Sequence, residues 1–542
     1  MAAGFDFIVI GAGSAGCVLA NRLSAAGASV LLLEAGGGDS RTDIRIPALA
    51  DQLLDSPVDW GYRTVPQREL LGRKIFLSRG KCLGGTSAIN AMVYMRGNRA
   101  DYDHWRTLGN EGWGYDDVLP CFRRSEGNRH LGGPFHGTDG PLAVSSFPAG
   151  SPIHEAFLAA AQDRGLPYNP DVNGATQEGC GPFQATIGLE GRCSAAAAFL
   201  HPVADRPNLR VETNAQATSL IVRGSRAVGV EYLKMGRPES AVAGVEIVLC
   251  GGAINSPQLL LLSGIGPAAD LRRLGIPVLL DLPGVGRNLQ DHLQVISRCE
   301  VTEPATLFGL TETEAGEAMR QSLEQGTGPF HSNFCEAGAF IGFGSPPGMP
   351  DVQIHCESYL SPPYYDGTPA DRHGFGLLMN VCRPESRGEV RLHSTDPLDR
   401  PLIDPRYLED ARDLDLTRLG LRACLEIAMA APMREIGTRR MQPDPGRDDD
   451  ASLTAFIRRA ATTIWHPVGT CRMGSDPMAV VDSRLRLHGI DGLRIADASI
   501  MPRIVSGNTN APCIMIGEKA SDLVLGAAGS LDREPARARA GA

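Results

Sequence analysis

The stretch FDFIVIGAGSAGCVLANRLSAAGASVLLLEAG, residues 5–36, decides the fold class. Its first six residues form a short apolar run that is typical of a buried parallel strand. The glycine-rich segment GAGSAG follows at once, and an apolar helical face and a second apolar strand come after it. The order strand, glycine turn, helix, strand predicts a Rossmann-like α/β unit that binds a dinucleotide.

Each glycine of this motif, and the acid after it, has a physical role. Gly11 allows the tight turn, Gly13 lets the backbone approach a pyrophosphate, and Gly16 lets helix and strand pack closely. Glu34, at the end of the second strand, can accept hydrogen bonds from the ribose hydroxyls of an adenosine and would repel a 2′-phosphate. The motif disfavours NADP and leaves NAD and FAD open.

Length and composition bound the rest of the chain. The 542 residues predict at least two domains, and 43% hydrophobic and 21% charged residues are ordinary for a globular protein. A net charge of −10 argues against a nucleic-acid partner. No basic leader precedes residue 5, and no apolar run reaches the roughly 20 residues that span a bilayer. We therefore expect a cytoplasmic protein, with the inner face of the membrane as a second location.

Cysteine and histidine spacing gives no sign of a metal site. The 13 cysteines are scattered without a CxxC pair, and the 12 histidines contain no HxxxH pair. We expect reduced cysteines and no bound metal.

Four later segments have readable patterns. Residues 208–234 alternate apolar and polar positions, which predicts a small antiparallel sheet. Residues 241–266 repeat the order strand, glycine turn, helix. An amphipathic stretch at 413–431 and a last helix at 511–526 follow. Residues 531–542 are polar and terminal, and we expect a disordered tail.

The segment TIWHPVGTCRMG, residues 463–474, contains one histidine, His466. By itself it leaves three roles open: a core residue, a metal ligand or a catalytic base.

Five motifs together resemble the glucose–methanol–choline (GMC) oxidoreductases. They are GAGSAG with Glu34, SRGKCLGGTSAINAMVYMRG (78–97), GGAINSPQLLLLSGIG (251–266), WHPVGTCRMG (465–474) and ADASIMP…GNTNAPCIMIGEKASD (496–522). The resemblance runs through nearly the whole chain in order. The second glycine-rich segment favours FAD over NAD, because a flavin needs a second, extended backbone cradle.

The resemblance implies an α/β fold, α+β overall. A Rossmann-like FAD-binding domain would be assembled from residues 1–150, 200–300 and 456–530. A substrate domain, built on an antiparallel sheet flanked by helices, would comprise residues 151–199 and 301–455.

The resemblance also implies where FAD lies. It would contact Gly11, Gly13, Ser14, Gly16, Glu34, Ala35, Arg79, Gly84, Ser87, Asn90, Ala91, Met92, Val93, Ala217, Ala253, Trp465, Asp497, Ala498 and Asn508. Some members attach the flavin through a histidine after the second glycine loop. TSAINAM (86–92) has none, so we expect non-covalent FAD.

The family's catalytic pair maps onto His466 and Asn510. A neutral imidazole can accept the hydroxyl proton of an alcohol, and an amide can donate to the same oxygen. The implied activity is oxidation of an alcohol, most simply a primary alcohol to an aldehyde, closest to the bacterial choline and aliphatic-alcohol dehydrogenases. The electron acceptor would be a quinone, an electron-transfer protein or O₂, and the protein a monomer or homodimer.

Other readings of the same scaffold stay open. They are an O₂-using aryl- or furan-alcohol oxidase, a hydroxynitrile lyase, a light-driven fatty-acid decarboxylase and a flavoprotein without turnover. Cys382, directly before Arg-Pro, resembles the decarboxylase branch, but that branch lacks the histidine that this chain keeps at His466.

The remaining polar candidates have ordinary interpretations. We expect His292 to be structural, and Asp291 and Asn288 to make loop hydrogen bonds. Glu336 is open between a substrate cavity and a salt bridge.

Overall fold

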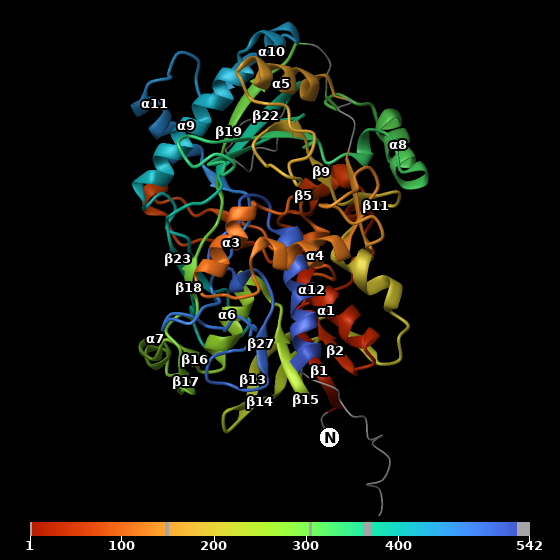
Figure 1. Cartoon of the computed structure of the whole chain (residues 1–542), viewed down its shortest axis with the longest axis vertical. Helices are drawn as coiled ribbons and strands as arrows, with labels where there is room; N and C mark the ends of the chain where they lie inside the picture. The colour runs from red at the N-terminus through yellow and green to blue at the C-terminus, as the bar shows by residue number, and fades with distance from the viewer. Residues whose placement is uncertain (1–2, 147–150, 303–305, 361–370, 528–542) are drawn as a thin grey trace, which may run out of the picture.

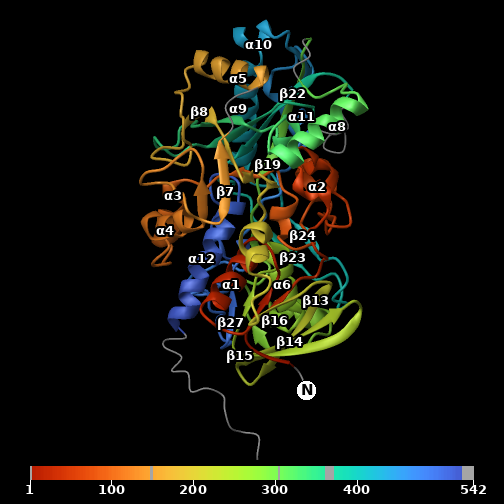
Figure 2. The same cartoon turned by 90° about the vertical axis from the view of Figure 1, so that its right-hand side faces the viewer.

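A computed structural model describes residues 3–146, 151–302, 306–360 and 371–527. Two large sheets lie at opposite ends of the molecule (Figure 1), and the two views show the same division (Figure 2). The first sheet lies near the N-terminus, and the second lies beneath the helices α5, α9 and α10.

The first sheet is parallel at its centre. Its order is β12-β2-β1-β15-β14-β13, and β27 pairs with β15. The strands are β1 (Ala3–Ile10), β2 (Val30–Leu33), β12 (Leu209–Glu212), β13 (Ala215–Arg223), β14 (Arg226–Lys234), β15 (Arg237–Leu249) and β27 (Leu493–Ile495). The predicted strand–helix–strand unit is confirmed, with α1 (Ser14–Ala25) between β1 and β2.

The expectation of a small antiparallel sheet at 208–234 was partly wrong. β13 and β14 do pair antiparallel, but β12 pairs parallel with β2. The long strand β15 explains the difference: its first part pairs with β14, and its later part pairs with β1 and β27. One strand thereby joins a hairpin to the parallel sheet.

The second sheet is antiparallel, in the order β25-β19-β22-β21-β20-β8, with β26 beside β19. Its strands are β8 (Gly179–Pro182), β19 (Leu293–Glu300), β20 (Ala337–Ile341), β21 (Val352–Glu357), β22 (Gly374–Val381), β25 (Arg439–Gln442) and β26 (Thr462–Thr463). β19 and β26 fall within ranges that the sequence assigned to the FAD-binding domain. The structure therefore shifts those two segments to the second sheet, because their backbones pair there.

Helices cover the second sheet on one face. They are α5 (Pro152–Asp163), α9 (Ala411–Ala428), α10 (Ala431–Glu435) and α11 (Asp450–Ala460), and they share one apolar core with the sheet. The predicted amphipathic stretch, 413–431, is α9 for nearly all of its length, and α10 begins only at its last residue, with Pro432 in the first turn of α10. Proline is favoured at a helix start and cannot continue a preceding helix.

The other helices are α2 (Thr42–Arg45), α3 (Arg99–Thr107), α4 (Tyr115–Ser125), α6 (Gly252–Leu262), α7 (Ala268–Arg273), α8 (Glu312–Arg320) and α12 (Asn510–Ala527). The last helix is thus confirmed, and it packs on α1 and α4. The expected tail, 531–542, lies outside the described residues.

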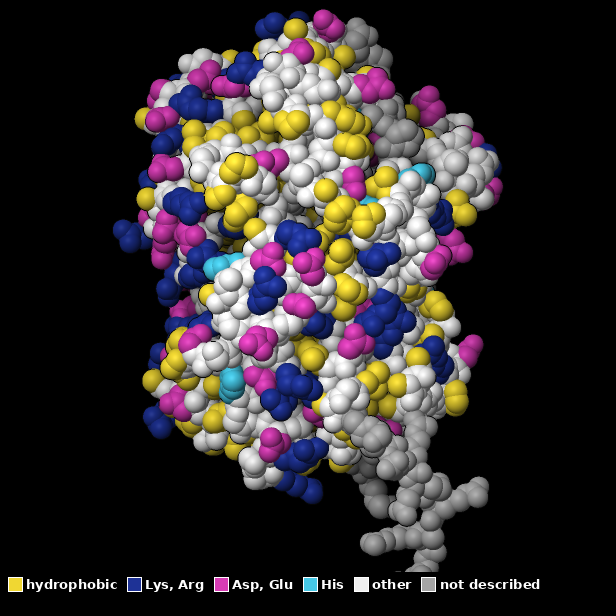
Figure 3. All heavy atoms as spheres, in the orientation of Figure 1, with side chains coloured by type: hydrophobic (Ala, Val, Ile, Leu, Met, Phe, Trp, Pro, Cys, Tyr) yellow, Lys and Arg dark blue, Asp and Glu magenta, His cyan; other side chains and the backbone are white. Residues whose placement is uncertain are grey.

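The remaining strands form smaller sheets of two to four strands. They are β3 (Tyr62–Arg63), β4 (Phe76–Leu77), β5 (Val93–Tyr94), β6 (Glu126–Asn128), β7 (Leu142–Ser146), β9 (Gln184–Ala185), β10 (Ile187–Gly188), β11 (Gly191–Arg192), β16 (Ile265–Gly266), β17 (Leu280–Asp281), β18 (Arg287–Leu289), β23 (Gly388–Arg391) and β24 (Leu402–Asp404). On the face in Figure 3, acidic and basic side chains are interspersed. Within the described ranges, no helix has the length and apolarity needed to cross a bilayer.

Candidate active site

One cavity is lined by residues from both sheets and from the segments that join them. Most of the residues predicted to contact FAD line it: Gly11, Gly13, Ser14, Glu34, Ala35, Arg79, Asn90, Ala91, Met92, Val93, Ala217, Ala253, Trp465, Asp497, Ala498 and Asn508. Both predicted catalytic residues, His466 and Asn510, line it too. Gly16, Gly84 and Ser87 do not, and their placement corrects the prediction.

The first glycine turn is shaped for a ligand that approaches the backbone. Gly11 has φ +107°, and a Cβ there would lie 2.5 Å from the carbonyl oxygen of Cys250. Gly13, in the lining, has open space around it, with its nearest atom 4.0 Å from an added Cβ. Gly16 faces the protein, where a Cβ would lie 1.9 Å from the Gly11 oxygen. Gly16 therefore serves close packing of α1, and Gly13 leaves room for the ligand.

Glu34 organises the turn as well as lining the cavity. One carboxylate oxygen accepts the Ala12 N–H at 3.0 Å and the other accepts the Gly36 N–H at 2.8 Å. Each oxygen has a further lone pair for a hydroxyl. Burial raises the pKa of Glu34 to about 7, against the lowering effect of these two backbone hydrogen bonds.

The second glycine-rich segment packs against the first turn. The Gly84 N–H donates to the Ala12 carbonyl at 2.8 Å, and Gly85 rather than Gly84 lines the cavity. The Ser87 hydroxyl donates to the Gly84 carbonyl at 2.6 Å and accepts from the Ala195 N–H. Gly84 and Ser87 thus fix the segment from behind.

Arg192, which sequence reasoning missed, braces the same segment. It donates to the carbonyl of Asn90 at 2.5 Å and to the side-chain oxygen of Asn90 at 3.0 Å. It also donates to the carbonyl of Ile44 at 2.8 Å. Burial lowers the pKa of Arg192 to about 9.

The donors around the cavity fit a dinucleotide. Arg79 lines it, and the buried Arg79 Nε has no hydrogen-bond partner among the described residues. A buried donor of this kind needs an acceptor, and FAD offers phosphate and carbonyl oxygens. With the open Gly13 backbone and the Glu34 carboxylate, the residues present fit FAD.

Backbone geometry positions His466 at the end of β26. Trp465 has φ +63°, an uncommon left-handed conformation for a large residue, and its N–H donates to the Thr463 hydroxyl at 2.7 Å. The His466 N–H donates to Asp291 Oδ1 at 2.7 Å, while Asp291 Oδ2 accepts the hydroxyl of Thr463 at 2.5 Å and that of Tyr407. Asp291 therefore does more than the expected loop bonding: it holds the backbone that carries His466.

The imidazole of His466 lies between a second histidine and an amide. Its Nδ1 is 3.0 Å from Nδ1 of His292, with the two rings nearly perpendicular at 84°. Its Nε2 is 3.4 Å from Nδ2 of Asn508. Burial lowers the pKa of His466 well below its usual value, and positive charge on His292, His355 and Arg79 would lower it further. The imidazole of His466 is therefore neutral at physiological pH.

Asn510 does not lie in the predicted position beside His466. Its side-chain oxygen accepts the Ser14 hydroxyl at 2.7 Å, at the start of α1. Asn510 begins α12 and Asn508 precedes that helix by two residues. The offset turns Asn510 toward the first glycine turn and leaves Asn508 beside the base. The predicted placement of Asn510 beside His466 was therefore wrong, and Asn508 lies there instead.

Asn508 is itself oriented by the second sheet. Gln353 Nε2 donates to Asn508 Oδ1 at 3.1 Å, and His355 Nε2 lies 3.3 Å from the same oxygen. Gln353, His355 and Glu357 alternate along β21, which places all three on one face of the sheet. This period of two was the signal that could have identified them from the sequence.

The other candidates have the following places. Asn288 makes the expected loop hydrogen bonds, to the carbonyls of Gly469 and Pro502. Glu336 accepts the Ser332 hydroxyl at 2.6 Å and lies 3.4 Å from Nδ1 of His154, outside the cavity lining. Cys382 is buried and also outside the lining, and burial raises the pKa of its thiol.

Comparisons with known proteins match nearly the whole chain. Models of the GMC oxidoreductase family match residues 5–294 and 384–517. Human mitochondrial choline dehydrogenase is 42% identical over 546 residues, covering 98% of this chain and 91% of that protein. The alcohol dehydrogenase [acceptor] of Pseudomonas putida is 41% identical over 532 residues, covering 96% of each.

A solved structure is similar over a comparable extent. Pyridoxine 4-oxidase from Mesorbium loti superposes with a TM-score of 0.84 at 34% identity, covering 95% of this chain and 98% of that one.

Proposed function

The chain belongs to the GMC oxidoreductase family, and from this premise we propose that it oxidises a primary alcohol to the aldehyde with His466 as the base. At the coarser level it is an FAD-dependent oxidoreductase that acts on CH–OH donors. What we propose beyond this is the kind of alcohol and the residues that act on it.

The observation that carries the proposal is the placement of the His466 Nε2 atom. His466 and Asn508 both line the cavity, and Nε2 is the ring nitrogen that lies beside the Asn508 amide. An alcohol oxygen near both groups would find an acceptor for its proton in His466 and a donor in Asn508. FAD, when bound, supplies the acceptor for the hydride from the alcohol carbon.

The work of the chain's own residues is to deprotonate and orient the alcohol. Removing the hydroxyl proton raises electron density at the oxygen and favours departure of hydride from the carbon. Asn508 holds the oxygen without competing for the proton, because an NH₂ group only donates. The general base alone contributes about 10²–10⁴-fold.

Two of the other readings gain less support from this geometry. A flavoprotein without turnover has no need of a neutral base and an amide donor that face one cavity. A lyase stays open, because it too would take a hydroxyl proton from its substrate. The position of Cys382 outside the lining removes the feature that favoured decarboxylation. Oxidase activity stays an alternative, and pyridoxine 4-oxidase shows that a similar structure occurs in an enzyme of that name.

A cationic alcohol, such as choline, is the substrate class that we propose. Besides Glu34 and Asp497, the cavity lining includes two further acids, the buried Glu357 and the partly buried Asp51. The rings of Phe334 and Tyr359 lie beside them, 5.1 Å apart. Arg79 is the one Lys or Arg among the described lining residues. Acids and aromatic faces together attract quaternary ammonium groups.

One nearby cation, Arg298, weakens the attraction of the cavity lining for a cationic alcohol. Arg298 pairs across β19 and β22 with Gly376, which in turn pairs with Glu357. Arg298 thus lies two strands from Glu357 and offsets part of its charge, so the preference for a cation should be moderate.

Anaerobic reduction of the flavin tests the reaction. The holoenzyme is mixed without oxygen with choline, its neutral isostere 3,3-dimethylbutanol, 1-butanol and benzyl alcohol. We expect bleaching of the flavin absorbance, and re-oxidation in air measures the oxidase component. Failure of every alcohol to bleach the flavin would contradict alcohol oxidation.

The ratio of kcat/KM for choline to that for 3,3-dimethylbutanol tests the substrate class. We expect a preference for choline of about 10- to 30-fold, from roughly 1–2 kcal/mol of cation binding. Glu357→Gln should reduce the ratio and leave the neutral alcohol unaffected. Equal values for the two alcohols in the wild type would overturn the cationic substrate while leaving alcohol oxidation intact. The electron acceptor, the oligomeric state and a location at the membrane stay predictions from the sequence.

A further inference from the structure

We infer that His292 is a positioning residue for His466: it fixes the tautomer in which His466 Nδ1 carries the hydrogen and Nε2 is free to accept the alcohol proton. The inference rests on the proposed function, since it assigns the reacting atom of the base. The sequence had suggested only a structural role for His292.

The first step concerns the hydrogen on His292. Its Nε2 lies 2.9 Å from the carbonyl oxygen of Cys382. A carbonyl oxygen can only accept, so His292 Nε2 must carry a hydrogen. In a neutral imidazole the other nitrogen then has a lone pair and accepts. His292 Nδ1 is therefore an acceptor.

Because His292 Nδ1 accepts, it also determines which nitrogen of His466 carries the hydrogen. The two Nδ1 atoms are 3.0 Å apart, and a hydrogen bond there needs one donor. Because His292 Nδ1 accepts, His466 Nδ1 must donate. In the neutral His466 ring this leaves Nε2 without a hydrogen, on the side where the ring meets Asn508. The carbonyl of Cys382 thus determines, through His292, which nitrogen of the base is available.

The surroundings of His292 keep its ring neutral. His292 is fully buried. The neighbouring carboxylate, Asp291, accepts from the N–H groups of His292 and His466 and from the hydroxyls of Thr463 and Tyr407, and it touches neither ring. Burial lowers the pKa of His292 to about 4, although the Cys382 carbonyl acts in the opposite direction.

The contacts on the other side of His466 lead to the same tautomer. Gln353 Nε2 donates to Asn508 Oδ1 at 3.1 Å, which turns the Asn508 NH₂ group toward His466 Nε2. An NH₂ group donates, so Nε2 must accept. Two chains of contacts, one from Cys382 and one from β21, therefore agree.

The arrangement also suits the protonated state of the base. When the alcohol O–H bond breaks and the proton forms an N–H bond at Nε2, Nδ1 keeps its hydrogen and its hydrogen bond to His292. No ring rotation or tautomer exchange is needed, and a neutral acceptor faces the new positive charge. Elsewhere, where a buried partner holds a catalytic imidazole in its tautomer, loss of that partner costs up to about 10⁴-fold.

Nitrogen-15 NMR of the holoenzyme with labelled histidine reads the tautomer directly, without substrate. His466→Ala identifies the signals of His466 by their loss. We expect a protonated Nδ1 and an unprotonated Nε2 in the wild type. A wild-type spectrum with the hydrogen on Nε2 would overturn the inference by itself.

Two substitutions at His292 add a kinetic readout. His292→Leu removes the acceptor, and His292→Asn can place its Oδ1 near the lost Nδ1. We expect anaerobic flavin reduction, by whichever alcohol of the panel reduces the wild type fastest, to slow at least about tenfold in His292→Leu. The apparent Kd of the alcohol should change little, and His292→Asn should recover most of the rate.

His136→Leu serves as the matched control. His136 is also buried and hydrogen-bonded through both ring nitrogens, but it lies outside the cavity lining. It should lose stability and keep both the reduction rate and the His466 signals. If His466→Ala is slow while His292→Leu reduces at the wild-type rate, the role of His292 is wrong and the proposed function stands. If both reduce at the wild-type rate, the proposed function itself is wrong.

Discussion

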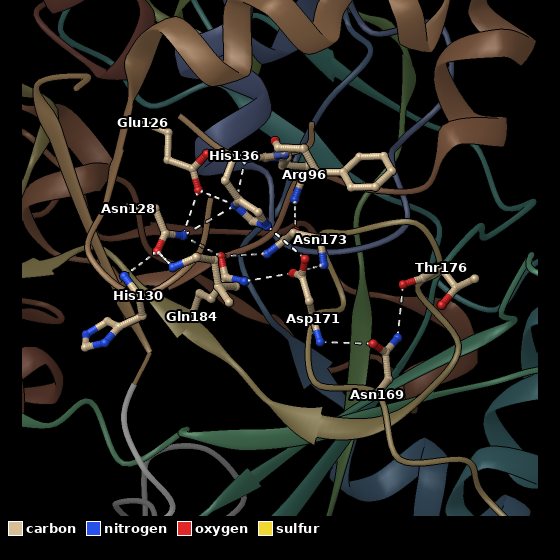
Figure 4. A network of polar contacts seen from close by, with 12 residues as sticks. Arg96, Glu126, Asn128, His130, His136, Asn169, Asp171, Asn173, Thr176 and Gln184 are labelled. Atoms are coloured by element: carbon tan, nitrogen blue, oxygen red, sulfur yellow. Dashed lines mark hydrogen bonds and ion pairs between the residues drawn. The ribbon is translucent and has the colours of Figure 1, made fainter. Parts of the chain in front are cut away.

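Two buried histidines of this chain, His466 and His136, have opposite electrostatic surroundings. Both are less than a tenth exposed. The ring of His136 lies between carboxylates, 2.8 Å from Glu126 and 2.8 Å from Asp171 (Figure 4). The ring of His466 touches an imidazole and an amide. The same residue type is therefore built into two different kinds of site.

The surroundings of His136 form an ion network. Glu126 also pairs with Arg96 and accepts from Asn128 at 3.0 Å, and the side chains converge as Figure 4 shows. Burial lowers the pKa of His136, but the hydrogen bonds to Asp171 and Glu126 outweigh burial and the net shift is upward. With both ring nitrogens facing carboxylates, His136 is held in its charged form.

The surroundings of His466 do the reverse. Among the described residues no carboxylate is hydrogen-bonded to its ring, and the nearby ionisable groups, His292, His355 and Arg79, all disfavour a second positive charge. Burial alone therefore does not determine the role of a histidine. The hydrogen-bond partners of the ring decide whether it is a fixed cation or a free base.

The largest expected effect in this comparison is at His466. His466→Ala should slow anaerobic flavin reduction by about 10²–10⁴-fold, because it removes the proton acceptor. FAD content and the far-UV circular dichroism should stay unchanged. Stopped-flow measurement on the holoenzyme checks this, and a rate near that of the wild type would end the assignment of His466 as the base.

The next effect is on stability, at His136. His136→Leu should lower the free energy of unfolding by about 3 kcal/mol, because it leaves two carboxylates in a largely buried site without their shared cation. Urea unfolding in the presence of excess FAD measures this. Flavin reduction by the variant should match the wild type. A slowed reduction with unchanged stability would reverse the roles that the comparison assigns.

A smaller effect distinguishes Asn508 from Asn510. Asn508→Ala should slow flavin reduction about tenfold, the worth of one hydrogen bond to a group that is charged in the transition state. Asn510→Ala should leave that rate nearly unchanged and weaken FAD retention through the lost contact with Ser14. The opposite pattern would restore the pairing that the sequence suggested.

The two asparagines also show what could not be predicted from the sequence. The glycine turn, Glu34 and the place of His466 in the cavity could be predicted, because local backbone chemistry and motif order determine them. Which asparagine faces His466 depends on where α12 begins, and an offset of two residues changes the direction of the side chain. A motif does not encode that offset.

The partners of His466 were harder still to predict. His292 and Gln353 come from segments more than a hundred residues away in the sequence, and only the pairing of β19, β21 and β22 brings them near the base. Pattern reasoning could have found the alternation on β21, but not what lies opposite it. The segments β19 and β26 were assigned to the FAD-binding domain although their backbones pair in the second sheet, since strand pairing over long distances has no local signal.

The smallest effect is the pH dependence of stability, in which His136 and His292, the neighbour of His466, act on opposite sides of neutral pH. The pKa of His136 is raised in the folded state. Its contribution is therefore fully present below the unfolded value, about 6.5, and is lost as the pH rises through the folded pKa. The pKa of His292 is lowered to about 4. Because unfolded His292 binds a proton between about pH 6.5 and pH 4 and folded His292 does not, its contribution to stability is present above pH 6.5 and lost as the pH falls.

Melting temperatures measured from pH 5 to 9 with saturating FAD should show that His136→Leu flattens the alkaline side of the profile and His292→Leu flattens the acid side. If His136→Leu flattened the acid side instead, the ring would be neutral in the folded protein, and the contrast between a fixed cation and a free base would be lost.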